Sequence, residues 1–370
     1  MFDYLRYYIV TLTALTGVAG FYLGGNWVWL GIGTFPVLMF FDVVLPPDTK
    51  PRNIKNPLLA DIPLYLHVPL MFLMYGFFAF DVASAKAVYA VDGSVLWGQA
   101  IGSLLSLAWI SAVPTLPISH ELMHRPHWFP RLCNKILNVF YMDTNRDTGH
   151  LITHHIYLDT PLDADTPARG QKIYPFLIQA TKGAYVDSIK AEAEGMVKRG
   201  LSPWNWRNKT YLQVITLAGL PLIVGYFGGA LAGIITVITM FLAKMIVEGF
   251  NYLQHYGLVR VVGSKVQLHH AWNHLGAIVR PLGVEITNHI NHHREGATLF
   301  HELRPEPEGA QMPSIFICFI AALFPSVWFK YIAMPRLEAW DKKLTSEEEK
   351  KLAMEANRKA GWPLWLEHAA

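Results

Sequence analysis

The chain has 370 residues, of which 52% are hydrophobic and only 16% are charged, and its mean hydropathy is +0.25. Soluble domains carry roughly 25% charged residues, so this composition favours a membrane protein over a water-soluble one. The formal net charge of +3 requires no nucleic-acid partner, because basic loops that face anionic lipid account for it. The two cysteines, Cys133 and Cys318, cannot hold a four-thiolate iron–sulfur or rubredoxin-type centre, and they indicate no disulfide framework.

Four stretches contain no Asp, Glu, Lys or Arg: residues 7–41, 62–80, 93–119 and 210–243. A membrane-spanning helix needs about 20 apolar residues. The two longest stretches each contain a glycine-rich break, "GGNW" at 24–27 and "GYFGG" at 225–229, so each can hold a helical hairpin. We therefore predict an all-α membrane protein formed by one integral-membrane domain, residues 1–370. Its transmembrane helices, about six in number, are expected near 7–23, 27–45, 62–80, 95–118, 210–226 and 229–247.

The basic residues predict how these helices are oriented. Lys50, Arg52 and Lys55 lie between the second and third spans, and residues 120–209 contain twelve Lys or Arg. Lys and Arg concentrate on the cytoplasmic side of membrane proteins. We therefore expect both termini, and the segments 120–208 and 248–309, to be cytoplasmic.

The apolar run 310–329 is long enough to span, but it contains Pro313 and Pro325. A seventh crossing would also place the charged tail on the opposite side of the membrane. We expect this run to lie at the interface or to pack on the core, so that residues 310–370 form an interfacial segment and a tail.

Nine of the 16 histidines fall into a pattern of four short motifs. On a helix, residues three or four apart share one face, so each cluster can direct its imidazoles to one point. Two of the clusters follow the fourth and sixth expected transmembrane helices, and the other two lie in the cytoplasmic segments after those helices. This arrangement predicts a single site at one membrane face. The motifs are "HELMH" with His120 and His124, "HLITHH" with His150, His154 and His155, "LQHYGL" with His255, and "NHINHH" with His289, His292 and His293.

The number of histidines bears on the metal. A catalytic zinc takes three protein ligands plus water, so nine imidazoles suit two ions with four or five nitrogens each. Imidazole is compatible with zinc, copper, iron or nickel, and the ligand type alone leaves these metals open.

"HELMH" also fits the H-E-x-x-H pattern of zinc proteases, in which Glu121 would polarise water. The longer metzincin pattern requires a glycine at position 127 and a histidine at 130, where this chain has His127 and Pro130. A protease would leave the other clustered histidines without a role. A metal transporter would place its ligands near the bilayer midplane rather than at the ends of helices, so both alternatives are disfavoured.

In their order and spacing, the four motifs resemble the histidine boxes of the integral-membrane di-iron monooxygenases. That superfamily includes the membrane alkane hydroxylases and, more remotely, the fatty-acid desaturases. The likeness is strongest to the xylene and p-cymene monooxygenase type and runs nearly end to end. It includes the flanking stretches "GFYLGG", "VPTLP", "YLDTPLD", "SPWN", "HHAWNH" and "NRKAGWPLW".

This resemblance implies that all nine clustered histidines are ligands of two iron ions (Fe2+/Fe3+), held on the cytoplasmic side of the bacterial inner membrane. It implies a hydroxylase that uses O2 and converts the methyl group of a toluene- or xylene-type aromatic into a benzylic alcohol. The implied electron donor is a separate NADH-dependent reductase that carries FAD and a 2Fe–2S centre. Hydroxylation of p-cymene or of terminal alkanes remains an alternative, and a desaturase is the nearest alternative reaction.

Metal-ligating histidines usually hydrogen-bond to nearby carboxylates. By position, the candidates for this role are Glu121, Asp143, Asp147, Asp159, Glu248 and Glu285. We expect one or two of the six to serve in it. His269, His270 and His274 in "LHHAWNH" are interpreted as local structure or as partners of the ligands, and His67, His127, His301 and His368 as non-ligands.

No residue is assigned to the substrate from the sequence. A basic surface that includes Arg125, Arg131 and Lys135 could dock an acidic reductase, although a lipid-facing positive belt explains the same charges.

Overall fold

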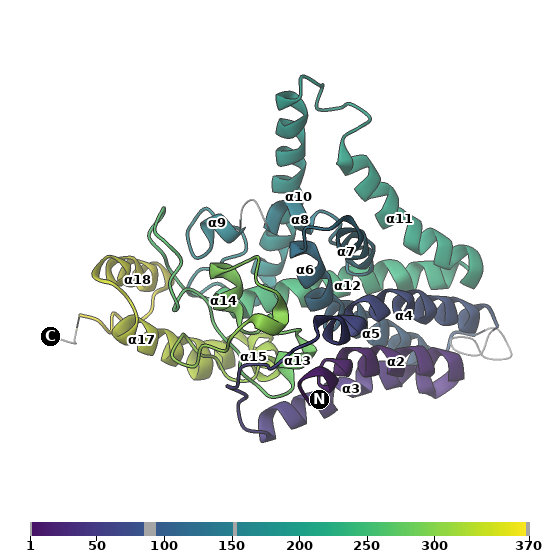
Figure 1. Ribbon diagram of the computed structural model, residues 1–370, viewed down its shortest axis with the longest axis horizontal. Coiled ribbons are helices and arrows are strands. Elements are labelled where there is room, and N and C mark those ends of the chain that lie inside the picture. Colours follow the sequence, from purple (N-terminus) through teal and green to yellow (C-terminus); the bar gives the residue numbers. More distant parts are fainter. Residues whose placement is uncertain (1, 85–93, 151–153, 368–370) are drawn as a thin grey trace.

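The computed structural model describes residues 2–84, 94–150 and 154–367. Within these ranges every regular element is a helix and no strand occurs, apart from an isolated bridge between Asn273 and Gln311. The prediction of an all-α membrane fold is confirmed. In Figure 1 the apolar helices α2, α3, α4 and α11 lie to the right, and α9, α14, α17 and α18 lie to the left.

Seven apolar helices build the bundle. They are α2 (Tyr8–Leu23), α3 (Leu30–Val44), α4 (Pro57–Ala83), α5 (Trp97–Ala112), α6 (Thr115–His124), α11 (Lys209–Gly228) and α12 (Ala230–His255). Because α3 continues a 3-10 turn from Gly25 and α5 runs on into α6, five helical stretches among the described residues are long and apolar enough to cross a membrane. Helix α2 has 16 residues and is shorter than these.

Two glycines with positive φ separate the paired helices. Gly24, with φ of 70°, lies between α2 and the turn that leads into α3, and Gly229, with φ of 85°, lies between α11 and α12. Residues with a Cβ rarely adopt this conformation. Both glycines fall in the two glycine-rich breaks that the sequence suggested.

The centre of the bundle is the α5–α6 stretch, most of which is buried, whereas α3 and α11 are mostly exposed. Helix α5 packs against α3 and α12, and α2 packs against α4. The edge-to-face rings of Phe21 and Phe78, 5.4 Å apart, lie between α2 and α4. The central α5–α6 stretch and α12, which packs against it, both end at histidines.

Helix α12 extends eight residues beyond the expected end of its span at 247 and finishes at His255. The charged residues Lys244 and Glu248, which suggested the end of the span, pair with each other at 2.6 Å. Lys244 Nζ also lies 2.9 Å from the Asp143 carboxylate. Because these buried charges are paired, the helix continues and carries its last turn to the histidine cluster.

Shorter helices cover the end of the bundle where these histidines lie. They are α1 (Phe2–Leu5), α7 (Trp128–Phe140), α8 (Arg146–Gly149), α9 (His155–Tyr157), α13 (Val279–Leu282), α14 (His289–Arg294), α17 (Met334–Lys343) and α18 (Glu347–Ala360). Helix α10 (Ile173–Lys198) precedes α11 and packs against α12.

The apolar run 310–329 contains α15 (Ile315–Ala322) and α16 (Pro325–Trp328). With eight residues, α15 is much shorter than the roughly 20 residues that a crossing requires. It packs on α12, where the Phe250 and Phe319 rings lie 5.5 Å apart.

A buried arginine joins the C-terminal helices to the segments that carry the histidines. The Arg169 guanidinium donates to both carboxylate oxygens of Asp341 at 2.7 Å, and to Asn357 at 2.8 Å. Its Nε donates to the carbonyl oxygen of Gly257, two residues after His255, at 2.8 Å. This clamp connects α17 and α18 to the end of α12.

Replacing Arg169 with alanine should lower the free energy of unfolding by about 3–5 kcal/mol, because it leaves the buried Asp341 carboxylate without its cation. Thermal denaturation of the purified protein in detergent measures the change. Arg199→Ala is the matched control, since that side chain is 53% exposed and lies 3.5 Å from Glu192; its loss should cost about 0–1 kcal/mol. Equal melting temperatures for the two variants would show that the clamp does not stabilise the fold.

Candidate metal centre

The nine clustered histidines come from four parts of the chain and meet at one end of the bundle. His120 and His124 lie one turn apart on α6. His150 follows α8, and His154 and His155 lie at the start of α9. His255 is the last residue of α12, and His289, His292 and His293 lie on α14.

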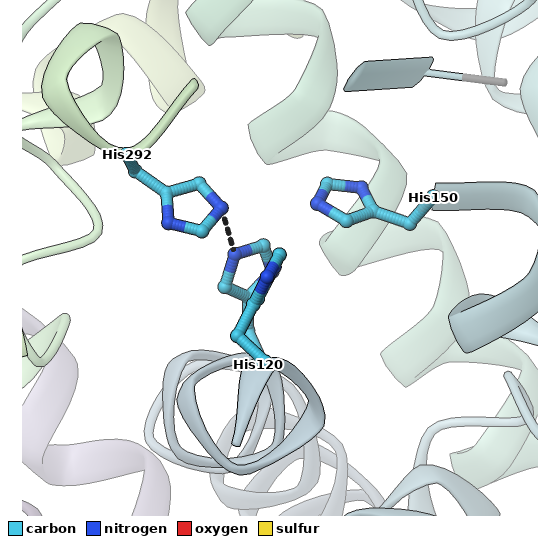
Figure 2. A group of neighbouring side chains, drawn as sticks. His120, His150 and His292 are labelled. Carbon is cyan, nitrogen blue, oxygen red and sulfur yellow. Dashed lines mark hydrogen bonds between the residues drawn. The ribbon is translucent and has the colours of Figure 1, made fainter. Parts of the chain in front are cut away.

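The rings form two groups. One contains His120, His124, His150 and His292, and the other contains His154, His255, His289 and His293; within each group the ligand atoms lie within 4.8 Å of one another. Figure 2 shows His120, His150 and His292 converging on one point from three separate segments.

His155 lies between the two groups. Its Nε2 is 3.1 Å from His150 Nε2 in the first group, and its ring centroid is 4.7 Å from that of His293 in the second. The sequence left open how the nine histidines divide between two ions. The geometry groups eight of the rings four and four, with the ninth imidazole within reach of both groups.

Hydrogen bonding alone does not explain how closely these nitrogens approach. His289 Nε2 lies 2.7 Å from His255 Nε2 and 2.9 Å from His293 Nε2. A ring nitrogen carries either one hydrogen or one lone pair, so His289 Nε2 can make only one hydrogen bond. One of these two contacts therefore has another cause.

The other ring nitrogens indicate what that cause is. His255 Nδ1 faces the Asp159 carboxylate at 3.3 Å, and His289 Nδ1 faces the carbonyl oxygen of Ile286 at 3.3 Å. A carbonyl oxygen only accepts, so His289 Nδ1 carries the hydrogen, and the single lone pair on its Nε2 is approached by two neighbouring ring nitrogens. Metal–imidazole bonds of about 2.0–2.1 Å at right angles place two nitrogens about 3 Å apart, so the donor set fits a bound cation.

Burial favours the neutral form of most of these imidazoles, which is the form that binds metal. Burial, together with the neighbouring imidazoles, holds the pKa of His150, His289, His292 and His293 well below the ordinary value. The same causes, burial first, lower the pKa of His155 to about 3.

Two carboxylates contact imidazoles of the cluster. Asp163 Oδ2 accepts from His154 Nδ1 at 2.9 Å, and Asp159 Oδ1 faces His255 Nδ1. Burial alone would lower the pKa of His154, but the Asp163 carboxylate outweighs it and raises that pKa. Burial, reinforced by the charge of Asp163, raises the pKa of Asp159 well above its ordinary value.

Asp159 was among the carboxylate candidates, but Asp163 was not. Its position eight residues after His155, in the stretch "YLDTPLD", was the available signal. Thr166 Oγ1 donates to Asp163 Oδ2 at 2.7 Å, and the Asp165 amide donates to Oδ1 at 3.0 Å. These bonds orient the carboxylate toward His154.

Asp143 and Glu248 belong to a buried ionic network beside the cluster. Arg146 and Lys244 each lie 2.9 Å from Asp143 Oδ2, and Lys244 also pairs with Glu248. Opposite charges surround both carboxylates, and neither makes a direct hydrogen bond to a ligand imidazole among the described residues.

Glu121 and Glu285 also have partners other than imidazoles. Arg125 lies 3.0 Å from Glu121 and 2.6 Å from Asp61 on α4. The buried Glu285 accepts from Arg52 and Arg280 at 2.7 Å each, and from Asn288 at 2.8 Å. Both carboxylates therefore connect a histidine-bearing segment to the rest of the fold.

The remaining candidates make no hydrogen bond to the nine clustered histidines among the described residues. Asp147 is half-buried, and its side chain makes no hydrogen bond or ion pair among the described residues. His269 and His270 contact Glu349 of α18 at 3.2 and 2.6 Å, and His274 Nδ1 contacts the Pro313 carbonyl oxygen at 2.7 Å. His368 lies outside the described residues.

Comparison with known proteins shows what kind of enzyme carries this centre. Residues 95–306, which include all nine histidines, match the fatty acid desaturase family. The chain is 54% identical over 365 residues to the xylene/toluene monooxygenase hydroxylase component XylM of Pseudomonas putida, covering 99% of this chain and 97% of that one. The chain is a membrane monooxygenase of the fatty acid desaturase family.

More distant relatives agree with this assignment. The monooxygenase is 25% identical over 327 residues to alkane 1-monooxygenase of Pseudomonas putida, covering 85% of this chain and 77% of that one. It is 26% identical over 267 residues to alkane 1-monooxygenase 1 of Pseudomonas aeruginosa, covering 70% of each chain. The predicted resemblance is confirmed, and the enzyme is an oxidoreductase.

Replacing Asp163 with asparagine should weaken metal binding by about 10- to 100-fold, because losing the partner of a ligand imidazole typically has this effect. Competition with a chelator, followed by metal analysis, measures the affinity. Asp147→Asn is the matched control, since its carboxylate has no partner among the described residues, and it should bind metal like the wild type. Equal affinities for the two variants would exclude a role for Asp163 in holding His154.

Proposed function

We propose that this monooxygenase holds two iron ions in its nine-histidine cluster and hydroxylates the methyl group of alkyl-substituted aromatics of the toluene and xylene type. The observation that carries the proposal is the buried cluster itself, at the end of apolar helices, in a chain with full-length similarity to a xylene/toluene monooxygenase hydroxylase component. Fold alone does not assign a substrate; the full-length similarity supports this one.

The reaction fixes what the site must supply. One hydrocarbon, one O2, two electrons and two protons give one benzylic alcohol and one water. Bound iron supplies the activation of O2, while the protein binds, orients and shields the reactants. Iron is compatible with imidazole ligands, and the first group with His120 would hold one ion and the second group with His255 the other.

The residues of the chain have separable tasks in this proposal. Asp163 would fix the ring of His154 with Nδ1 protonated, so that Nε2 is free for metal, and Asp159 would orient the ring of His255. His155 would serve either ion or both. The apolar helices that end at the cluster give a hydrocarbon a route from the bilayer, where apolar molecules concentrate.

The two electrons require a partner protein. We propose an NADH-dependent reductase with FAD and a 2Fe–2S centre, docking on the cytoplasmic face of the bacterial inner membrane. Lys135 and Arg131 are exposed and available to an acidic partner. Arg125 is only 9% exposed and pairs with Asp61 and Glu121, so docking would rest on the other two.

Two other functions are less well supported. Hydroxylation of terminal alkanes or of p-cymene uses the same chemistry, and similarity to alkane 1-monooxygenases at 25% identity gives it weaker support than the xylene/toluene relative. In a zinc protease Glu121 would face a metal-bound water, but it pairs with Arg125 at 3.0 Å.

Purified protein should contain two irons per chain and convert toluene to benzyl alcohol when supplied with NADH, reductase and O2. His255→Ala should lose iron and at least about 100-fold in activity, because it removes a ligand whose Nε2 faces His289. His127→Ala changes an exposed histidine and should keep both the iron and the activity of the wild type.

Metal analysis and product chromatography measure the two quantities. One zinc per chain together with peptide cleavage would overturn the proposal, as would full activity in His255→Ala.

A further inference from the structure

A small apolar pocket lies next to the histidine cluster, between the same elements that carry the ligands. Leu116 and Pro117 line it from α6, one turn before His120. Gln254 lines it from α12, immediately before His255, and Ile286 and Thr287 line it shortly before His289. The pocket is therefore within one turn of ligands from both groups.

The rest of the lining is hydrocarbon. Leu282 and Val279 of α13 and Phe316 of α15 face the pocket, and all three are at most 2% exposed. Ligand pockets of this kind are mostly apolar, with a few polar groups that fix orientation. This lining suits an apolar hydrocarbon better than a sugar, a nucleotide or a peptide.

One lining residue carries a buried polar atom without a partner. The Thr287 hydroxyl is buried without a hydrogen bond, and among the described lining residues it is the only such side-chain atom. The other polar side chain, Gln254, donates to the Ile286 carbonyl oxygen at 3.5 Å. A buried hydroxyl without a partner is costly, so a ligand oxygen at this position would relieve the cost.

We propose that this pocket binds the hydrocarbon part of the substrate and that the Thr287 hydroxyl hydrogen-bonds to the oxygen of the alcohol product. The inference rests on the proposed function and names the residues that set its substrate preference. Thr287 is two residues from His289, so a product oxygen held by it lies beside the metal-binding nitrogens.

The pocket is smaller than an aromatic ring requires. Its volume is about 40 Å³, whereas an apolar cavity that accepts benzene is about 150 Å³. An aromatic ring enters only when a lining side chain moves aside. Leu282 and Val279 lie on the four-residue α13, and shortening either side chain should favour a bulkier alkylbenzene.

The size of the pocket is tested by competition between p-cymene and toluene. Leu282→Ala should shift the ratio of kcat/KM toward p-cymene by about 10-fold or more, the effect of a carbon-sized change in an apolar pocket. Leu137→Ala is the matched control, since Leu137 is as buried on α7 but lies outside the lining. The ratio cancels any loss of active protein.

An equal shift in both variants, or none in Leu282→Ala, would overturn the pocket assignment. If Leu282→Ala does not fold, Val279→Ala gives the same comparison. Wild-type protein that hydroxylates neither hydrocarbon would instead refute the proposed function, so the two failures are distinguishable.

The proposed contact between the Thr287 hydroxyl and the product is tested by measuring inhibition by benzyl alcohol. Thr287→Val should weaken inhibition by benzyl alcohol about three- to tenfold, the effect of one lost hydrogen bond, with the KM for toluene unchanged. Thr287→Ser keeps the hydroxyl and should restore inhibition, and metal content must match the wild type in both variants. Equal inhibition of the valine and serine variants would overturn the role of Thr287.

Discussion

The close approach of imidazole nitrogens is the constraint on which the rest of this structure depends. His289 carries its hydrogen on Nδ1, and its Nε2 lies 2.7 Å from His255 Nε2 and 2.9 Å from His293 Nε2. One lone pair accepts only one hydrogen bond, so one of these buried contacts is costly without a compensating cation. A bound metal would relieve it, and metal binding would then contribute to the stability of this end of the fold.

Holding four separate segments in this position requires strong fixed contacts, and buried charges provide them. Lys244 joins α12 to the segment before His150 through Asp143, and Arg125 joins α6 to α4. Arg280 joins Glu285, four residues before His289, to Asp48 at 3.1 Å. Buried ion pairs of this kind add less to stability than their short distances suggest, but losing one partner is costly. They act chiefly by fixing where each histidine-bearing segment lies.

The sequence predicted much of this arrangement, and what it missed has physical reasons. Absence of charge located the apolar helices, and the spacing of the histidines located the residues that the structure brings together. The continuation of α12 past Lys244 and Glu248 was not predicted, because it depends on the pairing of these two buried charges. Asp163 was missed because its contact with His154 depends on the local turn between them, and the four-and-four grouping was missed because it depends on how distant segments meet. Arg169 and Asp341, 172 residues apart, also meet only in the folded chain, as does the lining of the pocket at Thr287, which comes from four helices and the loop after α13.

The most direct test of the central claim locates the metal itself. Anomalous X-ray scattering at the iron edge, from crystals of the iron-loaded enzyme, reports ion positions independently of activity. We expect two peaks, one among His120, His124, His150 and His292 and the other among His154, His255, His289 and His293. A single peak, or a peak beside His269, His270 and Glu349, would contradict the account.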